Sequence, residues 1–169
     1  LSSRGLGDVY KRQIGANADI NAVSITAGTI STNGTITTAI EEDGGNLGNV
    51  TLTGAVSLAG ATAIDTSSNG GTVGIVGGID GGNTLTITSG SGNVDVSGVF
   101  GATTAVGNTS INASSGTGTI DLANIGDGTP AAGIDGTLTV GNTLTNQVEF
   151  DGVNYDISGN VLIKSKSGD

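Results

Sequence analysis

The side chains of this chain that could do chemistry are mainly carboxylates. There are 15 Asp and Glu residues against five Lys and Arg, with no His and no Cys. Two carboxylates that converge on a sugar can hydrolyse glycosides, and polysaccharide lyases combine carboxylate-bound calcium with a cationic base. The aspartates are instead spread singly along the chain, at Asp80, Asp95, Asp121, Asp127, Asp135, Asp151 and Asp156. We therefore predict no enzyme activity, no catalytic residue and no cofactor.

The same acids give little indication of a metal site. Asp95 and Asp121 each lie between two apolar residues, which is typical of an outward-facing position on a strand. Without Cys or His the usual nitrogen and sulfur ligands of zinc are missing. Calcium is an open alternative, because residues 77–82 (Gly-Gly-Ile-Asp-Gly-Gly) and a diluted copy at residues 133–136 resemble the repeats of calcium-binding β-rolls. Glu41-Glu42-Asp43, the one acid cluster, is expected in a solvated loop.

Threonine pairs separated by one residue indicate a second alternative, ice binding. A flat solenoid face that carries rows of Thr-x-Thr can order water into an ice-like lattice. The candidate rows are Thr35-Ile36-Thr37, Thr51-Leu52-Thr53, Thr84-Leu85-Thr86-Ile87-Thr88 and Thr137-Leu138-Thr139. Threonine is also an ordinary outward-facing strand residue, and the unequal spacing of the rows argues against a single flat array.

The only aromatic and acid-rich patch contains Phe150 and Tyr155. Such a patch could stack against a sugar ring. We favour the alternative that it closes a hairpin or a longer loop, in which case Tyr155→Ala changes stability more than glycan binding.

The cations are confined to the two ends of the chain. The net charge is −10, and the five cations are Arg4, Lys11, Arg12, Lys164 and Lys166. No patch between residues 14 and 163 could neutralise phosphates, so binding to nucleic acid or to an anionic membrane is not expected. No apolar run reaches the length of about 18 residues that a membrane-spanning helix needs.

Residues 1–13 differ in composition from the rest of the chain. They hold three of the five cations, and Asp8-Val9-Tyr10-Lys11-Arg12-Gln13 resembles the translation of a transposase end sequence used as a sequencing adapter. We expect residues 1–13 to be a disordered artefact. Residues 14–169 are then expected to be a fragment of a longer protein.

Short alternating apolar runs after residue 14 predict β-strands, for example Leu85-Thr86-Ile87 and Ile120-Asp121-Leu122. Gly-Asn followed by a strand-forming residue recurs, at Gly48-Asn49, Gly82-Asn83, Gly92-Asn93, Gly107-Asn108, Gly141-Asn142 and Gly159-Asn160. Gly and Asn tolerate the left-handed backbone of a sharp corner, and stacked Asn side chains can form hydrogen-bonded ladders. Imperfect repeats of one strand-and-corner unit are typical of a solenoid.

We therefore predict an all-β fold, a right-handed parallel β-helix over residues 14–169, with a β-sandwich as the alternative. At ~20 residues per coil, this segment makes about seven or eight coils. Val, Ile, Leu and Ala are expected inside, with Phe100 and Phe150 among them.

The repeats also resemble those of a known protein family. Ile64 to Gly71 (IDTSSNGG), Gly78 to Thr88 (GIDGGNTLTIT) and Gly90 to Gly98 (GSGNVDVSG) resemble the repeat regions of filamentous-haemagglutinin-like large exoproteins and autotransporter-type adhesins. The resemblance covers residues 22–163. It implies a structural or adhesive stalk on the bacterial outer surface or outside the cell, exported by two-partner or autotransporter secretion. It further implies a role in adhesion, aggregation or biofilm, with glycans or proteins of host or neighbouring cells as partners.

Overall fold

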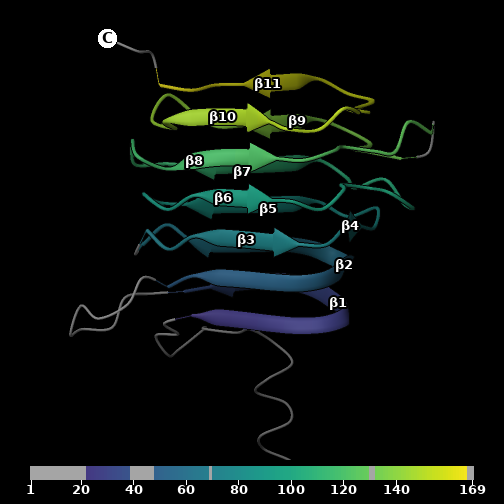
Figure 1. Ribbon diagram of the computed structural model, residues 1–169, viewed down its shortest axis with the longest axis horizontal. Helices are drawn as coiled ribbons and strands as arrows, with labels where there is room; N and C mark the ends of the chain where they lie inside the picture. Colours follow the sequence, from purple (N-terminus) through teal and green to yellow (C-terminus); the bar gives the residue numbers. More distant parts are fainter. Residues whose placement is uncertain (1–21, 39–47, 69, 130–131, 167–169) are drawn as a thin grey trace, which may run out of the picture.

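The computed structural model describes residues 22–38, 48–68, 70–129 and 132–166. Within these ranges the regular structure is all β-strand, and the coils stack into a parallel β-solenoid of about five turns (Figure 1). The predicted fold class is confirmed, and the β-sandwich is wrong because the described strands pair in parallel. Residues 1–13 and Glu41-Glu42-Asp43 lie outside the described residues. The described ranges contain no helix that could cross a lipid bilayer.

The first two strands are much longer than the others, because each passes through both sheets of the solenoid. The strands of the described ranges are β1 (Val23–Thr37), β2 (Val50–Thr66), β3 (Val73–Val76), β4 (Ile79–Asp80), β5 (Leu85–Ser89), β6 (Val94–Val96), β7 (Thr109–Ala113), β8 (Thr119–Leu122), β9 (Leu138–Val140), β10 (Gln147–Phe150) and β11 (Val161–Ile163).

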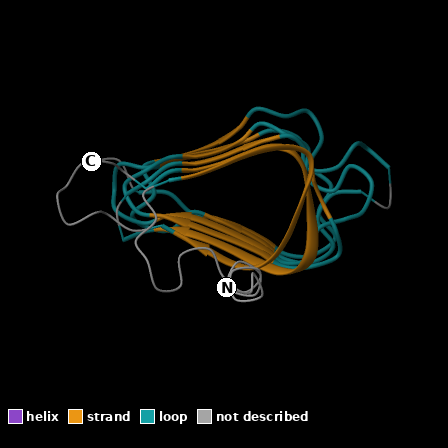
Figure 2. Ribbon diagram, turned by 90° about the horizontal axis from the view of Figure 1, so that it is seen from below, coloured by secondary structure: helices purple, strands orange, loops and turns teal. Residues whose placement is uncertain are grey.

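The strands form two stacks on opposite sides of a shared interior (Figure 2). The front sheet in Figure 1 contains β3, β6, β8 and β10, and the back sheet contains β5, β7, β9 and β11. The long strand β2 pairs with both β3 and β5 and so joins the two sheets. As the chain rises, its front strands run to the right and its back strands to the left, which is a right-handed winding (Figure 1).

Alternation of inward and outward residues builds the core. In the front sheet Val50, Val73, Val94 and Ile120 are paired on successive coils, and each is at most 1% exposed. The matching column of the back sheet consists of Ile36, Ile64, Ile87, Ile111 and Val140. Burial of each such side chain contributes ~1.5–3 kcal/mol, so the apolar interior is the main source of stability.

A third column lies at the corner that follows the front sheet. Isolated parallel bridges join Ile79 to Phe100, Phe100 to Ile125 and Ile125 to Tyr155. Phe100 is fully buried, and Phe150 is partly buried against the core. The interior position predicted for Phe100 is therefore confirmed, while Phe150 lies at the edge of the interior.

Glycines form a column of their own just before the front sheet. Gly71, Gly92 and Gly118 each precede a front strand by two or one residues, and a Cβ added to any of them would overlap a backbone carbonyl of the coil below. These three glycines do not have a positive φ. Close approach of neighbouring coils, and not a left-handed backbone, therefore requires glycine at this corner.

The Asn residues at the corners also act differently from the prediction. Among the described residues only Gly has a positive φ, so Asn is not used there for a left-handed backbone. Instead, the Oδ1 atoms of Asn49, Asn93 and Asn108 accept backbone N–H groups of the next coil at 2.8, 3.0 and 2.8 Å. The partners are Thr72, Thr119 and Thr137, so these Asn side chains tie coil to coil without the predicted Asn–Asn ladder.

The coils are longer than the sequence predicted. Hydrogen bonds between neighbouring coils join residues that are 22, 26 or 29 positions apart. The extra residues lie in corner loops, such as the one that begins after Ile125 and contains Asp127 and Thr129. Fewer coils therefore result, and the predicted seven or eight is an overestimate for the described chain.

Candidate functional site

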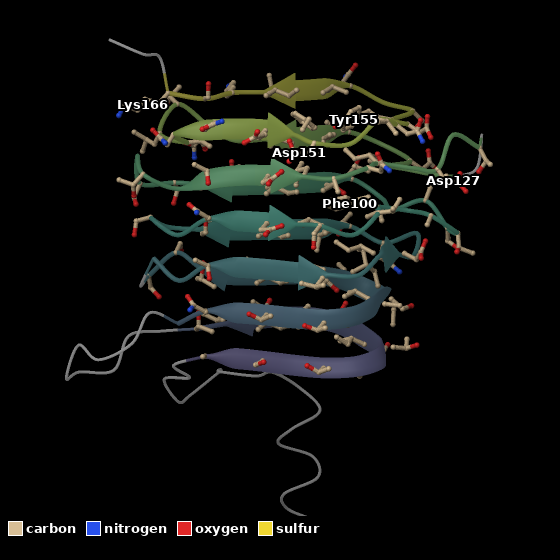
Figure 3. All side chains as sticks on the ribbon, in the orientation of Figure 1. Phe100, Asp127, Asp151, Tyr155 and Lys166 are labelled. Atoms are coloured by element: carbon tan, nitrogen blue, oxygen red, sulfur yellow. The ribbon has the colours of Figure 1, made fainter. Side chains whose placement is uncertain are left out.

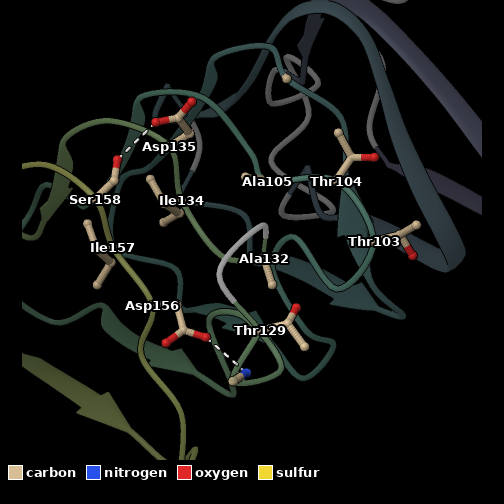
Figure 4. Close-up of a pocket in the computed structure, with 12 residues that line it drawn as sticks. Thr103, Thr104, Ala105, Thr129, Ala132, Ile134, Asp135, Asp156, Ile157 and Ser158 are labelled. Carbon is tan, nitrogen blue, oxygen red and sulfur yellow. Dashed lines mark hydrogen bonds between the residues drawn. The ribbon is translucent and has the colours of Figure 1, made fainter.

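A groove of about 870 Å³ lies on the side of the solenoid where the corner loops project. Its lining comes from consecutive coils, and Figure 4 shows Thr103, Thr104, Thr129, Asp135, Asp156 and Ser158 around it. Ala132 and Ile134, which are buried, also line it. The groove thus combines hydroxyls and carboxylates with a small apolar floor, and no Lys or Arg lines it.

The carboxylates of this region hold the loops in place. Asp135 accepts a hydrogen bond from the Ser158 hydroxyl at 2.9 Å, and Asp156 accepts one from the backbone N–H of Gly128 at 3.0 Å (Figure 4). Each carboxylate bridges two coils through these bonds. Asp135 and Asp156, which are 21 positions apart in the sequence, therefore lie beside the same groove. Each of them holds a loop against the neighbouring coil.

The calcium-like segment is braced in the same way. In residues 77–82, one carboxylate oxygen of Asp80 accepts the backbone N–H groups of Thr103 and Thr104 at 2.7 and 2.9 Å. The diluted copy at residues 133–136 lies in a different column, because Ile79 bridges to Phe100 whereas Ile134 bridges to Val106. The two copies are therefore not successive turns of a β-roll. The described residues contain no group of three or more Asp, Glu, His or Cys placed to hold a metal ion.

Hydrogen bonds also shape the exposed loop beside the groove. The hydroxyl and the backbone N–H of Thr129 donate to Asp127 at 2.6 and 2.9 Å. These bonds lower the pKa of Asp127 below its ordinary value, so this carboxyl stays ionised to a lower pH than an ordinary aspartate does. The hydrogen bonds from Thr129 to the Asp127 side chain, two residues earlier, form a local Asx-type turn.

Three further acids stack on the front sheet. Asp95 pairs with Asp121, and Asp121 pairs with Glu149, on successive coils. Burial, followed by the negative charges of Asp151 and Asp95, raises the pKa of Asp121 above its ordinary value. Asp95 and Asp121 face outward as predicted, but their wide spacing in the sequence concealed that they are stacked on neighbouring coils. Each of the three acids lies between two apolar residues, and this repeated pattern could have predicted from the sequence that they stack.

The threonine rows collect mainly on one sheet. Thr35-Ile36-Thr37 lies in β1, Thr84 to Thr88 begins one residue before β5 and runs along it, and Thr137-Leu138-Thr139 leads into β9, all on the back sheet. Thr51-Leu52-Thr53 lies in the part of β2 that pairs with β3 of the front sheet. The unequal sequence spacing therefore does not scatter the rows, because the corner loops absorb the difference in length.

The aromatic patch belongs to a coil and not to a hairpin. Phe150 ends β10, which pairs in parallel with β8, and Tyr155 bridges in parallel to Ile125. The two rings meet edge to face with centroids 5.3 Å apart, and the Tyr155 hydroxyl donates to the Gly152 carbonyl at 3.0 Å. Of the two predicted forms, the hairpin is wrong, and the patch lies where β10 ends and the longer segment toward β11 begins. Tyr155, labelled with Phe100 in Figure 3, continues the column of Phe100 and Ile125.

No match is found among protein-family models, curated proteins or solved structures. The surfaces of the chain therefore have to be interpreted from their own chemistry. They consist of a polar groove at the loops, a row of acids on the front sheet and rows of hydroxyls on the back sheet.

Proposed function

We propose that this chain is a structural and adhesive stalk segment of a secreted bacterial surface protein that acts in adhesion, aggregation or biofilm formation. The observation that carries the proposal is the continuous stacking of the described coils. The buried column from Ile36 to Val140 passes through one coil after another in register. A solenoid of this kind transmits force through nearest-neighbour contacts along its length.

Side chains strengthen the contacts between coils on more than one side of the rod. Asn93 joins its coil to Thr119 at the front sheet, Asn108 joins its coil to Thr137 at the back sheet, and Asp80 reaches Thr103 at the loop corner. Force applied along the axis loads these bonds together with the backbone bonds between strands. Such hydrogen bonds between coils are suited to a stalk that holds a partner-binding region away from a cell.

Glycans or proteins on host or neighbouring cells are the proposed partners. Among the described surfaces, the loop groove fits a neutral sugar best, because its Thr and Ser hydroxyls and its carboxylates can hydrogen-bond to sugar hydroxyls. Asp135 and Asp156 disfavour an anionic sugar there. An extracellular or outer-surface location follows from the proposed role.

Surface display tests the proposal. The full chain is fused between an outer-membrane carrier and a terminal epitope, and a Gly/Ser linker with the same number of residues serves as the control. We expect cells that display the solenoid to aggregate or adhere more than linker cells, and to present the epitope farther from the membrane. Neutral oligosaccharides in solution should compete with adhesion. Equal aggregation, adhesion and epitope reach for solenoid and linker would contradict the stalk.

A further inference from the structure

The back sheet carries an array of hydroxyl groups on its outer surface. Along β5 the outward Thr86 and Thr88 alternate with buried Leu85 and Ile87, and β7 and β9 alternate in the same way. We use the name hydroxyl array for the outward Thr and Ser residues of these three coils, which are Thr84, Thr86, Thr88, Ser110, Thr137 and Thr139.

The array is two-dimensional. Thr86 pairs with Ser110, and Ser110 pairs with Thr139, so three hydroxyls lie in register across three coils. Thr84 and Thr88 lie on either side of Thr86 along the chain. Neighbouring strands are ~4.8 Å apart, and outward residues two positions apart along a strand are ~6.6 Å apart. The outward side chains therefore mark out a lattice with these two spacings.

The hydroxyls of the array are available to water. Within the described part of the chain, none of the six side-chain hydroxyls makes a hydrogen bond to protein. Hydroxyls that point inward behave differently: those of Thr66, Ser89 and Thr145 donate to backbone carbonyls at 2.6, 2.7 and 2.8 Å. The contrast shows that the inward hydroxyls hold the corners together, whereas the outward ones are left for solvent.

The array is also uncharged. The outward residues beside its hydroxyls are the amides Asn108, just before β7, and Asn112 in β7. Charges border the array: Asp65 pairs with Thr88 from the coil below, Asp135 lies two residues before Thr137, and Lys164 follows β11 on the coil above. The front sheet, in contrast, stacks three acids on neighbouring coils. In a chain with a net charge of −10, the hydroxyl array is set apart as a neutral polar patch.

We propose that the hydroxyl array binds ice. The oxygen atoms on a prism face of hexagonal ice form a rectangular lattice with spacings close to those of the array. Water bound to the Thr and Ser hydroxyls can therefore occupy ice-like positions, while the threonine methyl groups fill the spaces between them. The strands hold the side chains in place before contact, so binding needs little further ordering. This activity goes beyond the stalk role and does not depend on it.

The test measures thermal hysteresis of the full chain, together with its incorporation into slowly growing ice. Thr86→Tyr places a bulky ring in the middle of the array, between the small residues Ala63 and Ser110. The matched control is Thr51→Tyr, which is outward-facing on the front sheet between Ser24 and Gly74. Circular dichroism establishes that each variant is folded.

The native chain and Thr51→Tyr are expected to show hysteresis and to enter the ice, and Thr86→Tyr is expected to lose both. Thr139→Ala removes one hydroxyl without added bulk and should lower the hysteresis even if Thr86→Tyr does not fold. The proposal is overturned if the native chain shows neither effect, or if the substitutions on the two sheets change hysteresis equally. Because the display assay of the stalk is run above freezing, each proposal can fail without the other.

Discussion

Gly92→Ala tests how closely the coils are stacked. Gly92 lies two residues before β6, and an added Cβ would overlap the carbonyl oxygen of Gly71 in the coil below. Because the obstacle is backbone, it cannot rotate away, and the coils have to separate locally. Overpacking of this kind costs typically ~1–3 kcal/mol. We expect the free energy of unfolding to fall by that amount, as measured by urea denaturation followed by circular dichroism.

The matched control is Gly74→Ala in β3. A Cβ on Gly74 meets no atom within 4 Å, and its φ is not positive. The substitution should leave stability unchanged or raise it by about 0.5 kcal/mol, because alanine restricts the unfolded chain. Equal effects of the two substitutions on the urea midpoint would refute the close stacking of Gly92 on Gly71.

Other predictions use the same urea assay. Asn93→Ala removes the acceptor for the Thr119 N–H and should cost about 1 kcal/mol; no loss would show that water replaces this bond. Phe100→Ala should cost ~3–5 kcal/mol, and Tyr155→Ala, at the exposed end of the same column, should cost less; the reverse order would contradict the column. Because the folded-state pKa of Asp121 is raised, stability should rise as pH falls from neutral toward its ordinary value of 3.8, and Asp121→Asn should flatten this rise and increase stability at neutral pH. A pH profile that is the same in the native chain and the variant would exclude this role of Asp121.

The strands and the solenoid could be predicted because both depend on local pattern. In Val94-Asp95-Val96 the apolar residues face the interior and the acid faces water, as alternation along a strand requires. Phe100 could be placed inside from its apolar side chain. Whether a residue faces the interior or the solvent is therefore determined by its own side chain and by the few residues beside it.

The register between coils could not be predicted, because it depends on the lengths of the corner loops. Asp95 and Asp121 pair only because the intervening loops fill one complete turn. The same dependence hid the alignment of Thr86 with Ser110 and Thr139, and for this reason the sequence argued against a flat array. Unequal loop lengths change the spacing in sequence while they preserve the spacing in space.

The corner residues were recognised but their role was not. Gly-Asn marked the turns correctly, yet the side chain of Asn108 acts on Thr137 in the next coil and not on its own backbone conformation. A hydrogen bond between residues 29 positions apart cannot be identified before the register is known. The bracing of the Gly128 loop by Asp156 was missed for the same reason.

The pairing of residues between neighbouring coils is tested most directly by disulfide formation between introduced cysteines. The chain has no cysteine of its own, so no native thiol competes. The pair Thr86→Cys with Ser110→Cys joins residues that are opposite each other on neighbouring coils. In the control, Thr86→Cys with Asn112→Cys, the second residue is two positions out of register, which places the Cα atoms about 8 Å apart, beyond the range of a disulfide. We predict that the first pair oxidises within one folded chain and that the second does not. Equal yields of the two disulfides, or a higher yield for the second, would contradict the stacked parallel register.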